Sequence, residues 1–243
     1  MTGAGAGQAT ATLLANFRDV GGLPADGGRR IRPGRLFRSD SLQELADGDI
    51  TNFVDRLGIR YIIDLRTAEE SVQQGRGPLG GYPIGYLNVP LVDVDAPSGP
   101  PGQVVLTQYV QHLDHDPNLP LAVEMVAHAV RLPTVVHCAA GKDRTGVVLA
   151  LVELLLGVPE EHVVADYMAT AANMAPILDR LRRWPRYADN TARLPAEIYR
   201  CEEHVIHGLL DAITSRYGGA EGWAARRGVD PEAVHRLRDR LLG

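Results

Sequence analysis

The stretch TVVHCAAGKDRTGVVLALVELLLG, residues 134–157, joins a short apolar run to a long one through a polar connection. Residues 134–136 are typical of a short buried strand. The run 144–156 is nearly all apolar and too long for a strand, so it predicts a buried helix that ends at Gly157. The connecting residues, 138–144, are small or charged. A strand followed by a short connection and a buried helix indicates an α/β sheet.

Strands and helices are both expected along the rest of the chain. Short extended pieces joined by glycine turns fit 16–42, and SLQE at 41–44 and TAEE at 67–70 are capping patterns. The further elements expected are strands at 59–65 and 86–91 and helices at 50–57, 104–114, 119–131, 159–184 with a break near Pro176, 195–216, 219–227 and 231–242. This order predicts an α/β domain with a central, mainly parallel sheet flanked by helices, and a largely helical C-terminal half.

Composition places the chain among ordinary globular proteins. Its 243 residues, 45% hydrophobic and 23% charged, suit one domain, which we assign to 16–243 after a flexible tail at 1–15. The formal net charge of -5 argues against a nucleic-acid binder, which normally carries a basic footprint. Because no apolar run reaches the roughly 18–20 residues of a membrane span, we expect no stable membrane insertion.

Cysteine content and the N-terminus bear on the compartment. The two cysteines, Cys138 and Cys201, do not make a disulfide framework, which favours a reducing compartment. The first residues carry no charged segment of the kind that opens a signal peptide. We therefore expect a cytoplasmic protein, or one secreted by a route without a classical signal peptide.

The connection 138–144 has the features of an oxyanion cradle. It follows the carboxyl end of a strand, where open α/β sheets bind ligands, and it leads into a helix N-terminus with unpaired N–H groups. The three residues after its cysteine are small, so an anion can approach the backbone, and its final arginine offers a fork of donors for two phosphate oxygens. The phosphate-binding residues expected are Ala139, Ala140, Gly141, Lys142, Asp143 and Arg144.

Cys138 stands at the mouth of this cradle. A free thiol is mostly protonated at neutral pH, but helix N-termini and neighbouring cations favour the thiolate. A thiolate under a bound phosphate is placed for in-line attack on phosphorus, which gives a covalent cysteinyl phosphate. We expect Thr145 to donate its hydroxyl to the sulfur, and His137 to orient the loop through hydrogen bonds.

The segment HCAAGKDRTG, residues 137–146, matches the His-Cys-x5-Arg signature of the cysteine-dependent protein tyrosine phosphatase superfamily. With NFRDVGG at 16–22 and IIDLRTAEE at 62–70, it resembles the microbial tyrosine-phosphatase and phosphoinositide-phosphatase-like family. The resemblance implies a phosphatase-like fold, Cys138 as nucleophile, Arg144 as phosphate ligand, and no metal or other cofactor. It also implies a helical insertion, at about 159–205, that forms a lid over the site.

The implied reaction is hydrolysis of protein phosphotyrosine through a cysteinyl phosphate, with phosphoserine, phosphothreonine and phosphoinositides as further substrates. The alternatives are a phosphoinositide phosphatase and a rhodanese-like sulfurtransferase, which also uses a loop cysteine. A nucleotide-binding P-loop is excluded, because Val136 and Asp143 stand where that motif needs Gly and Ser or Thr. The remaining histidines are scattered, which argues against a zinc site.

Protonation of the leaving group requires a carboxylic acid within hydrogen-bond reach. Asp143, inside the cradle, is the preferred candidate, and Asp93, with Asp95 beside it on the Pro/Gly loop 92–103, is the alternative. Lys142 is either a solvated lysine or a contact for a second phosphate on the substrate. Asp64 and Arg66 either form a plain ion pair at a strand end or brace the loop.

Overall fold

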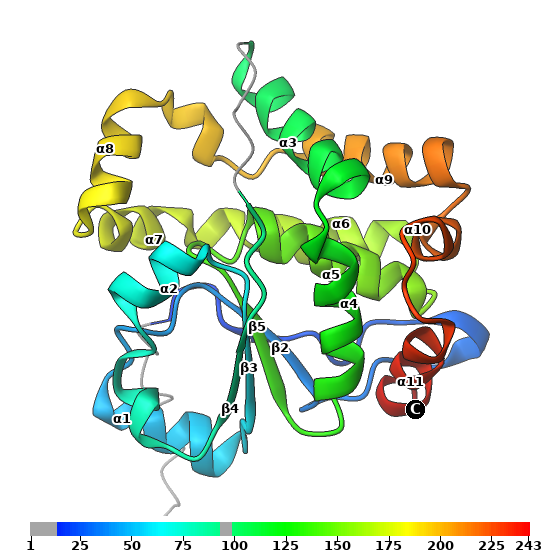
Figure 1. The fold of residues 1–243 in the computed structure, drawn as a ribbon, viewed down its shortest axis with the longest axis horizontal. Helices are drawn as coiled ribbons and strands as arrows, with labels where there is room; N and C mark the ends of the chain where they lie inside the picture. Colours follow the sequence, from blue (N-terminus) through cyan, green and yellow to red (C-terminus); the bar gives the residue numbers. More distant parts are fainter. Residues whose placement is uncertain (1–13, 93–98) are drawn as a thin grey trace, which may run out of the picture.

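A computed structural model describes residues 14–92 and 99–243 (Figure 1). Its centre is a five-stranded sheet in the order β1-β2-β5-β3-β4, in which β1 is antiparallel to β2 and all other neighbours are parallel. The strands are β1 (Arg18–Asp19), β2 (Leu36–Ser39), β3 (Tyr61–Asp64), β4 (Gly85–Asn88) and β5 (Thr134–His137). The prediction of an α/β fold with a mainly parallel sheet is confirmed.

Strand β5 lies in the middle of the sheet. Val135 pairs with Phe37 on β2 and with Ile62 on β3, and all four residues of β5 are buried. Burial on both faces explains why this strand has no polar alternation in its sequence. Because β2, β3 and β5 run in the same direction, the residues that follow them meet at one edge of the sheet.

Two apolar clusters hold the helices against the two faces of the sheet. Val136 and Ile63 belong to the larger cluster, whereas their neighbours Val135 and Ile62 belong to the smaller one, as expected from alternating side chains. The larger cluster includes α3 (Pro101–His115), α4 (Asn118–Ala129), α5 (Asp143–Leu155), α6 (Glu160–Met168), α9 (Glu203–Tyr217), α10 (Ala220–Arg226) and α11 (Pro231–Leu241). The smaller one includes α1 (Asp47–Thr51), the π-helical turn η2 (Asn52–Arg56) and the 3-10 turn η3 (Gly77–Gly81).

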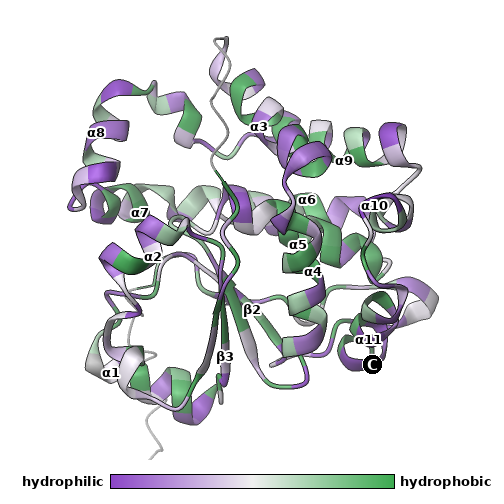
Figure 2. Ribbon diagram, in the orientation of Figure 1, coloured by the Kyte–Doolittle hydropathy of each residue, from purple (hydrophilic) through white to green (hydrophobic). Residues whose placement is uncertain are grey.

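Helix α5 is the predicted buried helix. Its run of green along the axis contrasts with the two-sided colouring of the peripheral helices (Figure 2). Gly157 follows it with a φ of 75°, the left-handed conformation that ends helices. The helix is hydrophobic on every side because the sheet and the surrounding helices enclose it.

The two predicted capping patterns have different outcomes. TAEE forms a complete capping box, in which Thr67 and Glu70 exchange hydrogen bonds at the start of α2 (Ala68–Gln74). SLQE is wrong as a cap, because the helix begins only at Asp47 and its preceding residue makes no side-chain cap. Instead, Ser41 is buried and its backbone N–H donates to the carbonyl of Ala139, so this segment lies against the polar connection after β5.

The C-terminal half is helical as predicted, but its divisions differ. The break expected near Pro176 falls earlier, at the 3-10 turn η4 (Ala171–Asn173), and Pro176 lies in the first turn of α7 (Met174–Leu181). Proline is tolerated there because first-turn N–H groups have no partner in the helix. The structure adds α8 (Pro185–Arg193) and the 3-10 turn η5 (Ala196–Tyr199), so α9 begins at Glu203 and not at 195.

Residues 1–13 of the expected tail lie outside the described residues. Leu14, by contrast, is buried in the smaller apolar cluster, and Ala15 packs near the loop that follows β5. Over the described ranges 14–92 and 99–243, the structure has no helix of the length and apolar character needed to cross a bilayer.

Candidate active site

The loop Cys138–Lys142 connects the carboxyl end of β5 to the N-terminus of α5. Gly141 adopts a φ of 68°, and a Cβ atom at this position would lie 2.3 Å from the carbonyl oxygen of Ser39. Both the left-handed backbone and the close contact require glycine. The sequence-predicted cradle therefore has a turn that no other residue type fits.

Buried side chains hold this loop from outside. The Asn16 amide donates to the carbonyls of Ala140 and Gly141, at 3.0 and 3.1 Å, and Arg38 donates to the Gly141 carbonyl at 2.6 Å. In a trans peptide the C=O and the following N–H point in opposite directions. The N–H groups of Gly141 and Lys142 therefore face the inside of the loop, where an anion would lie.

The thiol of Cys138 lies inside the loop. The side chain is buried, and the Gly141 N–H donates to its sulfur over 3.2 Å. This bond and the N-terminus of α5 place a donor N–H and the positive end of a helix dipole next to the sulfur. The Thr145 hydroxyl, expected to donate to the sulfur, is buried and has no hydrogen-bond partner among the described residues.

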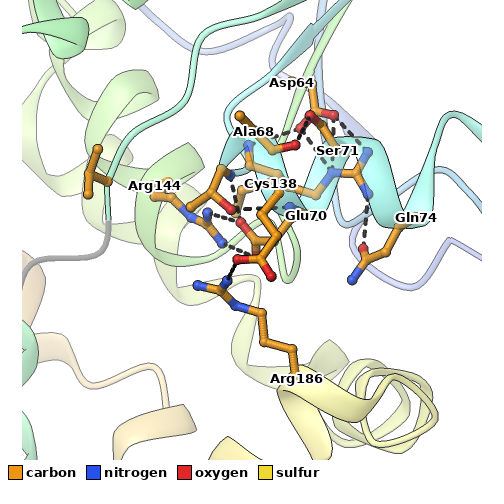
Figure 3. A network of polar contacts seen from close by, with 12 residues as sticks. Asp64, Ala68, Glu70, Ser71, Gln74, Cys138, Arg144 and Arg186 are labelled. Atoms are coloured by element: carbon orange, nitrogen blue, oxygen red, sulfur yellow. Dashed lines mark hydrogen bonds and ion pairs between the residues drawn. The ribbon is translucent and has the colours of Figure 1, made fainter.

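Arg144 is held by Glu70 from the first turn of α2. The two Nη atoms of Arg144 donate to the two carboxylate oxygens of Glu70, at 2.7 and 3.2 Å, in a bidentate pair (Figure 3). Burial raises the pKa of Glu70, but the charge and hydrogen bonds of Arg144 outweigh it and hold the pKa at about 2. Glu70 is therefore ionised throughout the neutral range, and it fixes the plane of the guanidinium.

Glu70 accepts further donors besides Arg144. Its Oε2 atom takes the backbone N–H of Thr67 at 2.6 Å, and its Oε1 atom takes the hydroxyl of Tyr187 from α8. Next to this contact, Arg186 donates to Glu69 at 2.9 Å. The first turn of α8 thus lies on the first turn of α2, at the carboxylate that positions Arg144.

Asp143, which also lines the pocket, has different hydrogen-bond partners from Glu70. Its Oδ1 atom accepts the hydroxyl of Tyr109 at 2.7 Å and lies 3.2 Å from the Lys142 ammonium. The Tyr109 hydroxyl in turn is 2.9 Å from that of Tyr167. The Asp143 side chain is 42% exposed, so this carboxyl reaches the pocket.

Lys142 is buried, not solvated. Its ammonium group donates to the carbonyl of Ile198 at 2.8 Å, in addition to its contact with Asp143. In this conformation the lysine joins the catalytic loop to the chain that leads into α9. A contact of Lys142 with a phosphate on the substrate stays a prediction.

Polar groups at the end of β3 support the base of the loop. His137 makes a 3.1 Å hydrogen bond with the Cys138 carbonyl, and its Nε2 atom lies 3.8 Å from Asp64. Burial lowers the pKa of His137, although the charge of Asp64 opposes this. Asp64 and Arg66 form a buried ion pair of 2.7 Å, and Tyr86 also donates to Asp64 at 2.8 Å.

One pocket of about 260 Å³ brings the three predicted catalytic side chains together. Cys138 lines it from the loop, Asp143 and Arg144 from the first turn of α5, and Tyr109 from α3. The residues that line it from 174–199, the segment of α7, α8 and η5, are Leu181, Tyr187, Asn190, Thr191, Leu194, Ile198 and Tyr199. This segment also packs on the loop itself, because Ala139 shares an apolar cluster with Met174 and Ile177.

Sequence reasoning missed the side chains that hold the site from a distance. Glu70 carried a signal, since the capping box placed it on α2, but nothing local linked it to Arg144. Asn16 lies in a motif noted in the sequence, whereas Tyr109 occurs in a helix without any motif. The alternative acids Asp93 and Asp95 lie outside the described residues.

A buried thiol, an arginine held by a carboxylate and a second carboxyl around one loop at a helix N-terminus are the groups that a cysteine-dependent phosphomonoesterase requires. Residues 10–243 match the model of a tyrosine phosphatase family, which is most of the chain. The chain belongs to the tyrosine phosphatase family, and its activity is that of a protein-tyrosine phosphatase. This match favours the phosphatase over the sulfurtransferase alternative.

Curated relatives resemble the chain over most of its length. It is 28% identical to the triple specificity protein phosphatase PtpB of Mycobacterium tuberculosis, over 94% of this chain and 96% of that protein. It is 29% identical to a tyrosine-protein phosphatase of Nostoc commune, over 90% of this chain and 78% of that protein. A putative tyrosine-protein phosphatase of Cupriavidus necator is 28% identical over 64% of this chain and 60% of that protein.

Proposed function

We propose that Cys138 is the nucleophile of this phosphatase, that the loop amides and Arg144 hold the phosphate, and that Asp143 is the general acid. The observation that carries this proposal is the single pocket shared by the three side chains. In the first step the Cys138 sulfur attacks phosphorus, the ester P–O bond breaks, and Asp143 gives its proton to the leaving oxygen. The product alcohol leaves a cysteinyl phosphate behind.

The second step returns the enzyme to its starting state. Asp143, now a carboxylate, takes a proton from a water molecule that attacks phosphorus, and the S–P bond breaks to restore the thiolate. The inward N–H groups and the bidentate fork of Arg144 stabilise the charge on the phosphoryl oxygens in both steps. The buried Thr145 hydroxyl, which lacks a partner among the described residues, suits a donor to the departing sulfur.

The pocket walls favour an aromatic leaving group. Tyr187 and Tyr199 stand with Leu181, Leu194 and Ile198 around the opening above Cys138. Phosphotyrosine in a phosphorylated protein is therefore the main substrate in this proposal. The name of the Mycobacterium tuberculosis relative, a triple specificity protein phosphatase, supports more than one substrate class, and the additional substrates in this proposal are phosphoserine, phosphothreonine and phosphoinositides.

In this proposal the helical insertion at about 159–205 forms the lid of the site through its 174–199 segment, within a single domain that begins near residue 16. Its support is the packing of α7 on Ala139 and the contact of α8 with the carboxylate that holds Arg144. Free cysteines at positions 138 and 201 suit the cytoplasm. Export without a classical signal peptide is the second location that fits, and fractionation of producing cells with an antibody to the chain separates the two.

The test is an assay of the purified chain without added metal against four substrate classes. Peptides that carry phosphotyrosine should be hydrolysed fastest, and peptides with phosphoserine or phosphothreonine and vesicles with phosphoinositides should follow. Cys138→Ser should abolish every activity and still bind phosphate esters, because a serine hydroxyl is far less ionised than a thiol in the same field. Turnover at half the parent rate in this variant would sink the proposal.

A further inference from the structure

The two oxygens of Asp143 stand in different surroundings. Oδ1 accepts the Tyr109 hydroxyl at 2.7 Å and faces the Lys142 ammonium at 3.2 Å. Oδ2 has no hydrogen-bond partner within the part of the chain that the structure describes. Because the side chain is 42% exposed and lines the pocket, Oδ2 is the oxygen that a substrate can reach.

The direction of the hydrogen bond between Tyr109 and Oδ1 follows from the nearby Lys142 ammonium. An ammonium group can only donate, so a proton on Oδ1 would face the donor hydrogens of Lys142. Oδ1 therefore accepts, and Tyr109 uses its single hydroxyl proton on it. That leaves the Tyr109 oxygen as the acceptor for Tyr167, whose hydroxyl is 2.9 Å away.

Both phenols keep their protons at neutral pH. Burial and then the charge of Asp143 raise the pKa of Tyr109 well above its ordinary value, and the same causes raise the pKa of Tyr167. Tyr109 is also locked in place, since it is buried and its ring meets that of Tyr167 edge-on at 6.3 Å. The pair is thus a rigid donor and not a proton relay.

We propose that Tyr109 is the positioning residue of the general acid and that it forces the transferable proton onto Oδ2 of Asp143. This inference rests on the proposed role of Asp143. In the first step the Oδ2–H bond breaks and its proton goes to the leaving oxygen, while Tyr109 stabilises the carboxylate that forms. In the second step Oδ2 takes a proton from the attacking water.

Other ionisable groups surround Asp143, and none of them makes a hydrogen bond to Oδ1 in place of Tyr109 among the described residues. Asp143 contributes to a raised pKa for Tyr199 and for Cys201, whose pKa is about 11, with burial as the largest cause in both. The groups that share its surroundings are His112 from α3, Cys138, Lys142 and Arg144 from the loop, Tyr187 from α8, Tyr199 from η5 and Cys201 before α9. Among the described residues, the only other group set against Oδ1 is the Lys142 ammonium, which forms an ion pair with it.

Tyr109→Phe is the main test, because it keeps the ring and removes the donor. For phenyl phosphate, a poor leaving group, kcat should fall about tenfold, a part of the roughly hundredfold that a general acid contributes. For p-nitrophenyl phosphate, which scarcely needs a proton, kcat should stay within about twofold. Loss of the donor favours the protonated carboxyl, so the alkaline limb of the kcat/KM profile should move to higher pH.

Tyr167→Phe is the matched control, because it leaves the Tyr109 donor in place. It should change the ratio of the two substrates by less than about twofold. Replacing Tyr109 by 3-fluorotyrosine gives a second measurement with almost no change in shape. Its stronger donor should move the alkaline limb to lower pH, which also tests the inference if the phenylalanine variant does not fold.

The outcomes separate this inference from the proposed function beneath it. Equal losses on both phosphates with an unmoved alkaline limb would reduce Tyr109 to a packing residue. If Asp143→Asn shows the leaving-group dependence and neither Tyr109 variant does, only the positioning role fails. If Asp143→Asn shows none, the general-acid assignment itself is wrong.

Discussion

Two carboxylates flank the catalytic loop, and they are bonded in opposite ways. Glu70 has donors on both oxygens, namely two from Arg144, one from Thr67 and one from Tyr187. Asp143 has donors on one oxygen and leaves the other open to the pocket. A carboxylate with every acceptor position filled holds a neighbour in place, whereas one with an open oxygen can exchange a proton. The difference in donors therefore supports the roles proposed for the two carboxylates, Glu70 as a structural partner and Asp143 as the general acid.

The largest effect is expected from replacing Arg144, the cation that Glu70 binds. Arg144→Lys keeps a positive charge but loses the fork that meets both Glu70 and the phosphoryl group. We expect kcat to fall about a thousandfold on every substrate, regardless of the leaving group. Steady-state kinetics with phenyl and p-nitrophenyl phosphate measure this, with Arg186→Lys on the surface of α8 as the control. Near-parent rates would show that Arg144 does not contact the phosphoryl group.

The next effect concerns the open carboxylate. Asp143→Asn cannot donate an acidic proton, so kcat for phenyl phosphate should fall about a hundredfold, and for p-nitrophenyl phosphate only a fewfold. A plot of log kcat against leaving-group pKa should become steeper in the variant. Asp179→Asn, an exposed carboxylate on α7, is the control and should leave the plot unchanged. Parallel plots would move the general acid to Asp93 or Asp95.

A smaller effect on rate, but a clear one on stability, is expected from Glu70→Gln. Glutamine has the shape of glutamate and keeps one acceptor oxygen, but it removes the negative charge that pairs with Arg144. We therefore expect kcat to fall about tenfold on both phosphates alike. In the parent, the Glu70 pKa of about 2 lies below the ordinary 4.5, so ionised Glu70 stabilises the fold at neutral pH. The stabilisation, on the order of 3 kcal/mol, is fully present above pH 4.5 and is lost as the pH falls toward 2.

Urea unfolding at several pH values isolates this contribution. The parent should lose stability between about pH 4.5 and 2 more steeply than Glu70→Gln, which has no carboxylate to protonate at this site. Glu69→Gln on the same turn is the control, because Glu69 makes an exposed ion pair. Identical slopes in parent and Glu70→Gln would show that Glu70 is not held ionised by Arg144.

The smallest effect is expected at the contact between the first turns of α8 and α2. Tyr187→Phe removes one of four donors from Glu70, and Arg144 continues to hold the carboxylate. We expect a two- to threefold change in kcat/KM and a loss of about 1 kcal/mol, the usual range for one hydrogen bond. Thermal melts and kinetics on a phosphotyrosine peptide measure both. A loss as large as that of Glu70→Gln would mean that α8, and not Arg144, positions this carboxylate.

The local part of the site could be predicted from the sequence, whereas its long-range part could not. The strand, the loop and helix α5 follow from consecutive residues, and so does the capping box of Thr67 and Glu70. The pair of Glu70 with Arg144 spans 74 residues, and that of Tyr109 with Asp143 spans 34. Neither pair leaves a periodic signal, because a single contact between two elements depends on how they pack.

The helix boundaries in the C-terminal half were likewise predictable only in part. Pro185 and Pro231 begin helices in the way their chemistry suggests, since each stands in a first turn. Pro176 also lies in a first turn, that of α7, whereas the sequence pattern predicts a break in a longer helix near this residue. Whether a proline starts a helix or interrupts one depends on the residues before it, and here the preceding helix α6 had already ended at Met168.

The bonds from Asn16 and Arg38 to the loop carbonyls also have a thermodynamic consequence. Protein contacts alone hold the amides toward the proposed phosphate position, so binding should order little additional backbone. Phosphate and vanadate should therefore associate with a small loss of conformational entropy. Their affinity then reports the electrostatics of a finished cradle rather than any folding of the loop.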